Sequence, residues 1–408
     1  MPAITSVRGR VIFDSRGADT IEVEVDSGGR TGRACAPAGA SVGRHEAAAF
    51  APGGPAESLS RLLGAAPSIT GADAGDPAAV RAALRTADGT PRYEVVGGAA
   101  AFALSMAAAE SAALADGVPL FESLGEGPFY IPYPLGNVLG GGAHAGPGAP
   151  DIQEVLVCAT GMGDARSAAC ANASVHRELG RVLAEKDPGF TGGKGDEGGW
   201  APSLGNEEAL ECAARACERL GFTLGREVSL GVDFAASTQW DGKAYDYARA
   251  GRSHDPGEQV EFAAGLISRF KLAYAEDPVH EDDFEGMAEL TRRFPDVMVT
   301  GDDLTATNTG ILGRAASSGS CNAAILKVNQ AGCLADALEF AALARDSGIR
   351  LATSHRSGDT TDPHIAHVGI ATGSRMLKAG VVGGERIAKV NELLRLEGHG
   401  LIRGMAGA

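Results

Sequence analysis

Six strand-like segments in the second half of the chain each end on an ionisable side chain. These strand-end residues are Asp233, Glu276, Asp302, Lys327, His355 and Lys378. From Glu276 onward they are separated by 26, 25, 28 and 23 residues, about the length of one strand plus one helix, repeated. This period predicts a β/α barrel. Because a barrel brings its strand ends to one face, we expect these six side chains to converge there.

The beginning of the chain has a different pattern, which predicts an α+β unit. β-branched residues cluster on both sides of the turn-like Asp14-Ser-Arg-Gly17, which indicates a hairpin. Helical segments follow, one of them with Pro77 in its first turn. The expected elements of this unit are strands over residues 4–13, 20–26 and 31–36 and helices over 76–87 and 98–115.

The fold class is therefore predicted to be α/β, a C-terminal β/α barrel with an N-terminal α+β capping domain. Prolines punctuate Tyr130-Ile-Pro-Tyr-Pro134, so this segment is the expected joint. The capping domain would cover residues 1–130 and the barrel residues 131–408. Helical stripes are expected over residues 257–270, 332–347 and 385–394, and we expect the glycine-rich tail from 398 to 408 to fray.

Composition excludes several classes of protein. Length alone is compatible with roughly two to three domains, and 44% apolar residues suit a large core. A net charge of −16 argues against nucleic acid or an anionic membrane as a partner.

The most apolar stretch, 97–115, is rich in alanine and interrupted by polar residues, so we expect a buried helix. The first eight residues lack an apolar signal core, and seven scattered cysteines suit reduced thiols in a cytoplasm.

Asp233, Glu276 and Asp302 predict a site for a hard divalent cation. Each follows an apolar run and stands where its strand should end. One such acid is usually a helix cap or a surface charge, but three at successive strand ends fit that interpretation poorly. With oxygen ligands only, Mg²⁺ is favoured over Zn²⁺.

Lys327 and Lys378 stand at two further strand ends and suggest proton abstraction. Either lysine by itself is more often structural than catalytic. Beside a bound cation, however, like charge would lower the pKa of Lys327, and a lysine of lowered pKa is a usable general base. Together with the three acids, the two lysines favour the catalytic interpretation.

Three other motifs bear on the site. Gly193-Lys-Gly-Asp-Glu-Gly-Gly-Trp200 lacks the phosphate-loop pattern and instead suggests an acid held on a tightly turned backbone. His355-Arg356-Ser357 offers a cation, a fork donor and a hydroxyl, which suits an anionic group. His364 and His367 are three residues apart; a second metal site is one interpretation, and a solvated or core pair is the favoured one.

Many short motifs, in order along nearly the whole chain, resemble those of the enolase family. They include Asp14-Ser-Arg-Gly17, Gly141-Gly-Ala-His144-Ala-Gly146, Gln153-Glu154, Gly195-Asp-Glu197-Gly-Gly, Glu276-Asp-Pro278, Gly301-Asp-Asp-Leu-Thr305, Leu326-Lys327-Val-Asn-Gln330, Ser354-His-Arg-Ser-Gly358 and Lys378-Ala-Gly380. Enolase-superfamily sites use a Lys or His base together with Mg²⁺. The resemblance implies a Mg²⁺-dependent lyase that acts on a small phosphorylated or phosphonylated carboxylate.

The resemblance also implies a role for each site residue. Lys327 would remove the proton α to the substrate carboxylate, and Lys378 would stabilise the enolate. Glu197, with Glu154 beside it, would help the β-hydroxyl leave. The first Mg²⁺ would be bound by Asp233, Glu276 and Asp302, and a second Mg²⁺ by Ser41. The pocket would be lined by His144 and His355, and the phosphate would be bound by Arg356 and Ser357.

Several loops depart from the family pattern. The family's usual Pro-Ser-Gly-Ala-Ser-Thr is Pro37-Ala-Gly-Ala-Ser-Val42, the segment from His144 to Glu154 is one residue longer, and Gly383-Gly384 replaces Arg-Ser. Both ends are shorter than the family's usual length. These departures suit a paralogue acting on a relative of 2-phosphoglycerate, such as a carboxyphosphonoenolpyruvate synthase of phosphinate antibiotic biosynthesis. They would make activity on 2-phosphoglycerate weak.

Two other classes are alternatives. A non-catalytic binding or structural relative would usually have lost the lysines or the metal acids, and a barrel lyase of the wider superfamily would lack the Gly-Asp-Glu-Gly-Gly segment. The resemblance further implies a homodimer, or a higher oligomer, in which Glu22 pairs with Arg395 of a second subunit.

Overall fold

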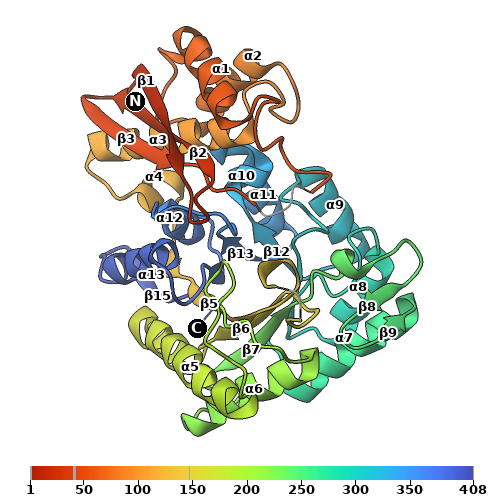
Figure 1. The fold of residues 1–408 in the computed structure, drawn as a ribbon. Coiled ribbons are helices and arrows are strands. Elements are labelled where there is room, and N and C mark those ends of the chain that lie inside the picture. Colours follow the sequence, from red (N-terminus) through yellow and green to blue (C-terminus); the bar gives the residue numbers. More distant parts are fainter. Residues whose placement is uncertain (1, 40–42, 147, 408) are drawn as a thin grey trace.

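The computed structural model describes residues 2–39, 43–146 and 148–407, in which a three-stranded antiparallel sheet precedes a closed eight-stranded barrel (Figure 1). The predicted fold class is confirmed. The predicted domain boundary at residue 130 stays a prediction; it falls within the short strand β4, Phe129–Ile131.

The predicted hairpin is present and carries the N-terminal sheet. The turn between its strands is fixed by Asp14, whose Oδ1 accepts the amide N–H groups of Arg16 at 2.8 Å and Ala18 at 2.9 Å. Gly32 lets the sheet approach the long helix behind it, because a Cβ at this position would lie 2.1 Å from the carbonyl oxygen of Ala107. The elements are β1 (Ile4–Phe13), β2 (Asp19–Ser27), β3 (Arg30–Cys35), α1 (Gly54–Ile69), α2 (Pro77–Asp88), α3 (Gly98–Asp116) and α4 (Leu120–Leu124).

Helix α3 is the buried helix that the sequence predicted. Among the described residues it is the one helix whose length and apolar composition would allow it to cross a membrane. Within the protein, 83% of its apolar window is buried. The helix packs along β2 and β3, so its apolar surface belongs to the core.

The barrel opens differently from the predicted strand–helix repeat. Its strand order is β10-β11-β12-β13-β14-β5-β6-β7, and β6 runs antiparallel to both of its neighbours. We did not predict β5 and β6, because β5 contains Pro134 and two glycines and two helices separate β6 from β7. The strands are β5 (Tyr133–Gly140), β6 (Glu154–Cys158), β7 (Ser229–Asp233), β10 (Tyr274–Glu276), β11 (Met298–Gly301), β12 (Ala323–Leu326), β13 (Arg350–Ser354) and β14 (Met376–Lys378).

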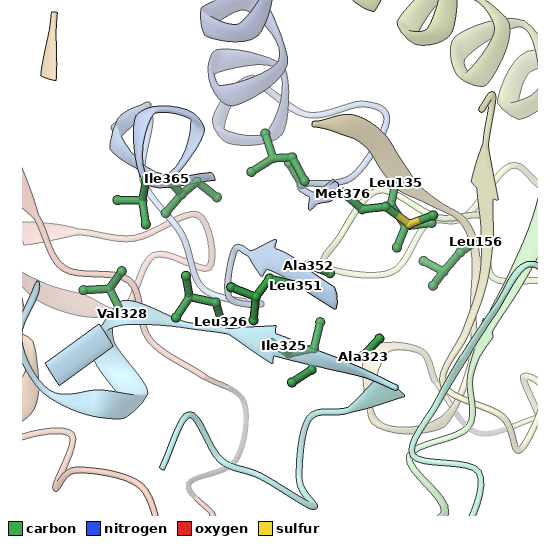
Figure 2. Packing of buried hydrophobic residues seen from close by; sticks show 14 of the residues in the cluster. Leu135, Leu156, Ala323, Ile325, Leu326, Val328, Leu351, Ala352, Ile365 and Met376 are labelled. Carbon is green, nitrogen blue, oxygen red and sulfur yellow. The ribbon is translucent and has the colours of Figure 1, made fainter. Parts of the chain in front are cut away.

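Helices surround the barrel, and its strands contribute to a continuous apolar core. Figure 2 shows Ile325 of β12, Leu351 of β13 and Met376 of β14 in this core with Ile365 of a surrounding helix. The remaining elements are α5 (Ala165–Lys186), α6 (Asn206–Arg219), α7 (Pro256–Phe270), α8 (Phe284–Arg293), α9 (Thr309–Ser318), α10 (Val328–Ala331), α11 (Leu334–Asp346), α12 (His364–Ala371), α13 (Gly384–Leu396), the hairpin β8 (Tyr245–Tyr247) and β9 (Arg252–His254), and the short helices η1 (Gly142–His144) and η2 (Ala236–Gln239).

The expectation that the C-terminal tail frays is wrong for its described part. Strand β15 (Ile402–Met405) pairs in parallel with β4. Met405 is buried, and the amide of Ala406 donates to the carbonyl of Ile131 at 2.8 Å. Apolar residues after the glycines therefore hold the tail against the start of the barrel domain.

The capping unit packs against the barrel through α2 and α3, which contact α10 and α11 (Figure 1). Ala38 and Gly358 exchange backbone hydrogen bonds of 2.7 and 2.9 Å, which ties the start of the chain to the loop after β13. This contact places residues from the N-terminal unit beside the strand ends of the barrel.

His364 and His367 prove to be buried members of acid pairs. His364 lies 3.2 Å from Glu110 of α3 and also pairs with Asp362, while His367 lies 3.3 Å from Glu392. Burial disfavours a charged His364, but the carboxylates of Asp362 and Glu110 outweigh it and raise the pKa of His364 to about 10.

We predict that His364 of α12, through its pair with Glu110 of α3, stabilises the contact between these two helices in a pH-dependent way. A pKa raised in the folded state contributes stability that is fully present below about pH 6.5 and is lost as pH rises through about 10. The stability lost in His364→Gln, measured by urea unfolding, should therefore be largest near neutral pH and shrink towards pH 10. The same change at exposed His45 is the matched control. A loss at His364 that does not vary with pH would contradict a charged histidine.

Candidate active site

The six strand-end residues predicted to converge do lie together at one rim of the barrel. Asp233, Glu276 and Lys378 are the last residues of β7, β10 and β14, and the other three follow β11, β12 and β13 directly. Five of the six line a cavity of about 140 Å³, and Glu276 is fully buried beside them. Ser41, the proposed ligand of a second metal, lies outside the described residues.

Glu154 reaches this rim because its strand is antiparallel. It is the first residue of β6, so the amino end of β6 lies beside the carboxyl ends of the other strands. Glu154 is the register partner of Asp233, which is itself the register partner of Glu276. Three carboxylates therefore stand side by side on β6, β7 and β10.

The ammonium group of Lys378 sits among these three carboxylates. Its Nζ lies 2.6 Å from Glu276, 2.8 Å from Glu154 and 3.0 Å from Asp233. Burial disfavours the charge of Lys378, but the three acids outweigh it and raise its pKa well above the usual value. In this arrangement the charged form of Lys378 is favoured.

Lys327, which follows β12, pairs with Asp302, which follows the neighbouring strand β11. Burial disfavours the charged lysine, but Asp302 outweighs it and raises the pKa of Lys327. From the sequence, the pKa of Lys327 is expected to fall because of a cation bound nearby. Here Asp302 pairs with Lys327 itself, so the pKa of Lys327 rises instead. Asp302 is further oriented by two contacts. Asp277 accepts the amide N–H of Asp302 at 3.0 Å, and Gln330 donates at 3.4 Å to Oδ1 of Asp302, the oxygen that does not contact Lys327.

The predicted metal ligands are chemically suited to a hard cation. Oε1 of Glu276 is buried and has no hydrogen-bond partner among the described residues. Burial and the charge of Asp233 raise the pKa of Glu276 well above its usual value, so its charged form calls for a cation. Asp302 also forms a close carboxylate group with Asp277 and Asp303, although Asp277 uses both its oxygens to accept backbone N–H groups.

Two carboxyl groups beside His144 differ in their protonation. Burial and the charge of Glu197 raise the pKa of Glu154 to about 7. Burial also disfavours the charge of Glu197, but His144 at 3.7 Å and His355 at 3.3 Å hold its pKa well below the usual value. Burial disfavours a charged His144 as well, yet Glu197 and Glu154 raise its pKa to about 9. The pair thus holds one carboxylate and one group that keeps a proton near neutral pH.

Arg356 and Ser357 face the same cavity from the loop after β13. Arg356 is buried and donates to Glu46 at 3.1 Å and to Asn329 at 3.3 Å. Glu46 comes from the N-terminal unit, and its other oxygen accepts the amide N–H of Gly43 at 2.8 Å. The buried hydroxyl of Ser357 has no partner among the described residues, so it can donate to a bound anion.

Some residues that shape the site were not predicted from the sequence. Glu46 and Asp277 act through one contact each with Arg356 and Asp302, and no local pattern shows such contacts. Arg386 is different, because it is a cation on the buried face of α13, one turn before Lys389 and in line with Leu393. A charged residue on an otherwise apolar stripe was a signal for a buried polar network.

Two family models match the chain over nearly its whole length. "Enolase, N-terminal domain" matches residues 4–124, and "Enolase, C-terminal TIM barrel domain" matches residues 128–402.

Curated proteins named "Enolase" are similar to the chain from end to end. That of Methanothermobacter thermautotrophicus is 46% identical, covering 97% of this chain and 96% of its own length. That of Halobacterium salinarum is 46% identical (97% and 99% covered), and that of Pyrobaculum aerophilum is 42% identical (95% and 94% covered). The shortened ends that we read as a departure are therefore shared with these relatives, which match this chain over almost their full length.

We predict that Lys378 offsets the charge of the three acids around it. Lys378→Met leaves buried carboxylates without a counter-charge, so the free energy of unfolding at pH 8 should fall by about 3–5 kcal/mol. The loss should be smaller at pH 5, where the acids can take up protons. Urea unfolding in the presence of a chelator measures both values, with Lys243→Met on an exposed loop as the control. An equal loss at the two pH values would contradict the prediction.

Proposed function

Since this chain belongs to the enolase family, we infer that it is a carbon–oxygen lyase that converts 2-phosphoglycerate to phosphoenolpyruvate. The observation that supports this most directly is the set of groups in and beside one cavity: two lysines, a carboxyl pair, an arginine–serine pair and three acids. An elimination of this kind needs a base, a proton donor for the leaving group and fixed positive charge for the anionic intermediate.

Lys327 is the proposed base, which takes the proton α to the substrate carboxylate. It lines the cavity, and its pairing with Asp302 supports the role, because a cation that takes over Asp302 would release the lysine. Lys378 is proposed to supply positive charge to the enolate, which is supported by its place in the cavity wall beside three acids.

The metal ligands are proposed to be Asp233, Glu276 and Asp302, with Ser41 for a second ion. The family implies a divalent cation, usually Mg²⁺, and carboxylate oxygens are the ligands that this ion prefers. When bound, it supplies positive charge against the charge that grows on the substrate carboxylate.

Glu154 and Glu197 are proposed to assist the departure of the β-hydroxyl group. The pKa of about 7 supports Glu154 as the member that carries the proton, while Glu197 stays ionised between His144 and His355. The phosphate group is proposed to bind Arg356 and Ser357, which is supported by the unpaired hydroxyl of Ser357.

The comparisons do not favour the alternative functions. Identity of 41–46% along nearly the full length of proteins named "Enolase" favours 2-phosphoglycerate over a carboxyphosphonate. Retained lysines and acids disfavour a non-catalytic relative. We therefore expect ordinary rather than weak activity on 2-phosphoglycerate, in spite of the altered loops.

Lys327→Ala should abolish both turnover of 2-phosphoglycerate and exchange of its α-proton with deuterium oxide, because the base is gone. Glu197→Gln should slow turnover while leaving part of the exchange, because it acts on the leaving group. NMR of the substrate measures exchange, and a coupled assay measures turnover. Wild-type exchange in Lys327→Ala would remove this lysine from the role. Failure of the wild-type protein to turn over 2-phosphoglycerate would overturn the proposed function itself.

Asp302→Asn should weaken Mg²⁺ binding at least tenfold and abolish turnover, because it removes one charged oxygen ligand. Isothermal calorimetry with Mg²⁺ alone measures the affinity. Asp283→Asn, at a helix N-cap away from the cavity, is the control. Unchanged affinity in Asp302→Asn would exclude Asp302 as a ligand.

A homodimer is also proposed, through a groove of about 780 Å³ on the outer face of the N-terminal sheet. Phe13 and Leu114 line it with 72% and 46% of their surfaces exposed, which supports a second chain at this place. Glu22, the residue expected to pair across subunits, also lines it, although within one chain it pairs with Arg10 and Arg33.

The cytoplasm is the proposed compartment, supported by seven unpaired cysteines.

Sedimentation at micromolar concentration should give at least twice the chain mass of 41.4 kDa. Phe13→Glu should shift the protein towards the monomer, because it introduces a charge into the apolar part of the groove. Leu220→Glu, at an exposed apolar position outside the groove, should leave the mass unchanged. A wild-type monomer would overturn the proposed dimer.

A further inference from the structure

Arg386 is a fully buried cation that the proposed reaction does not use. Its side chain has no exposed surface and lies behind the loops that carry the cavity residues. Nη1 donates to the carbonyl of Arg356 at 2.6 Å, and Nη2 donates to the carbonyls of Ser357 at 2.6 Å and Asp196 at 3.2 Å. One guanidinium group thus joins the loop after β13 to the loop that carries Glu197.

The same guanidinium contacts the ring of His355. Nη1 of Arg386 lies 2.7 Å from Nδ1 of His355. Arginine is always charged and can only donate, so Nδ1 must be the acceptor in this hydrogen bond and cannot carry a proton. A neutral imidazole then has its one proton on Nε2, which lies 3.3 Å from Oε2 of Glu197.

We propose that Arg386 is a positioning residue that holds His355 as the neutral tautomer with its proton on Nε2, the ring nitrogen that lies near Glu197. The proposal deepens the proposed function, and it rests on that function only for its effect on the reaction. A proton fixed on Nε2 lies near Oε2 of Glu197, at an N–O distance of 3.3 Å, and so favours the ionised form of this carboxyl group.

The charges around His355 agree with a neutral ring. Glu197 and Asp359 are the acids that face it, and Arg386 is the cation. Burial is the largest influence and lowers the pKa of His355 to about 4, in spite of the attraction of Glu197. His144, on the opposite side of Glu197, has a raised pKa, so the two histidines beside one carboxylate are held in different states.

The backbone around Arg386 is shaped to admit its side chain. Gly380 and Gly383 have φ values of 80° and 106°, and a Cβ on either would lie 3.1–3.3 Å from Cγ of Arg386. Gly383 is one of the two glycines in which the chain departs from the family pattern. Nε of Arg386 lies 3.2 Å from Glu385 without a hydrogen bond among the described residues, so the guanidinium group is held through its two terminal nitrogens.

The state of the ring can be measured directly by NMR of the purified protein with ¹⁵N-labelled histidine, without substrate or metal. The signals of His355 are those that His355→Gln removes. We expect an unprotonated Nδ1 and a protonated Nε2 that stay unchanged between about pH 5.5 and 8, where ordinary histidines titrate. A proton on Nδ1, or titration of the ring in this range, would overturn the proposal.

Arg386→Lys tests the cause. One ammonium group cannot reach all the atoms that accept hydrogen bonds from the guanidinium group of Arg386. We therefore expect a mixture of the two His355 tautomers. We also expect kcat to fall about a hundredfold or more, with a smaller change in KM. Lys389→Met removes another buried cation one turn along the same helix, where it pairs with Asp359 at 2.9 Å, and should leave the His355 signals as in the wild type.

Three outcomes separate the possibilities. Unchanged His355 signals in Arg386→Lys would overturn the role of Arg386. The same disturbance in Lys389→Met would show general loosening of the loop and would also overturn it. If Arg386→Lys fails to fold, the wild-type spectrum still decides the tautomer. Because the spectrum needs no turnover, a protein inactive on 2-phosphoglycerate would refute the proposed function and leave this test intact.

Discussion

The ammonium group of Lys378, at 2.6–3.0 Å from three buried carboxylates, is the interaction on which the rim of the barrel depends. Charges of one sign on adjacent strands repel strongly in a dry interior, and a cation on the opposite strand lets them stay there together. In the proposed function, the same lysine supplies positive charge to the enolate. The Lys327–Asp302 pair is a second contact between a lysine and an acid, at the neighbouring strands β11 and β12.

Around this centre, other buried polar groups hold the residues that the proposed reaction uses. Asp277 orients Asp302, Glu46 orients Arg356, and Arg386 orients His355. Each supporting group is buried, so its hydrogen bonds are protected from water and its geometry is well defined. The charge states of the Glu154–Glu197 pair have other causes: in spite of burial, His144 and His355 hold the pKa of Glu197 low, whereas burial and the charge of Glu197 raise the pKa of Glu154.

Parts of this arrangement could be predicted and parts could not. The strand-end acids and lysines were predictable because a barrel repeats at a nearly constant length, so spacing carries position. Strands β5 and β6 were not, because proline and glycine weaken the strand signal and two helices interrupt the repeat. The tail was expected to fray on its glycines, yet Met405 is buried and β15 pairs with β4. That pairing depends on a strand more than 270 residues away in the sequence.

The sequence by itself determined the fold class, the family and the residues that meet at the rim, because period and motif are local properties of the chain. Only the tertiary structure decided the charge states. Whether Lys327 is paired, which carboxyl group keeps a proton and which nitrogen of His355 is protonated depend on burial and on neighbours from distant segments. Electrostatic energy varies with distance and local dielectric, and neither quantity exists until the chain has folded.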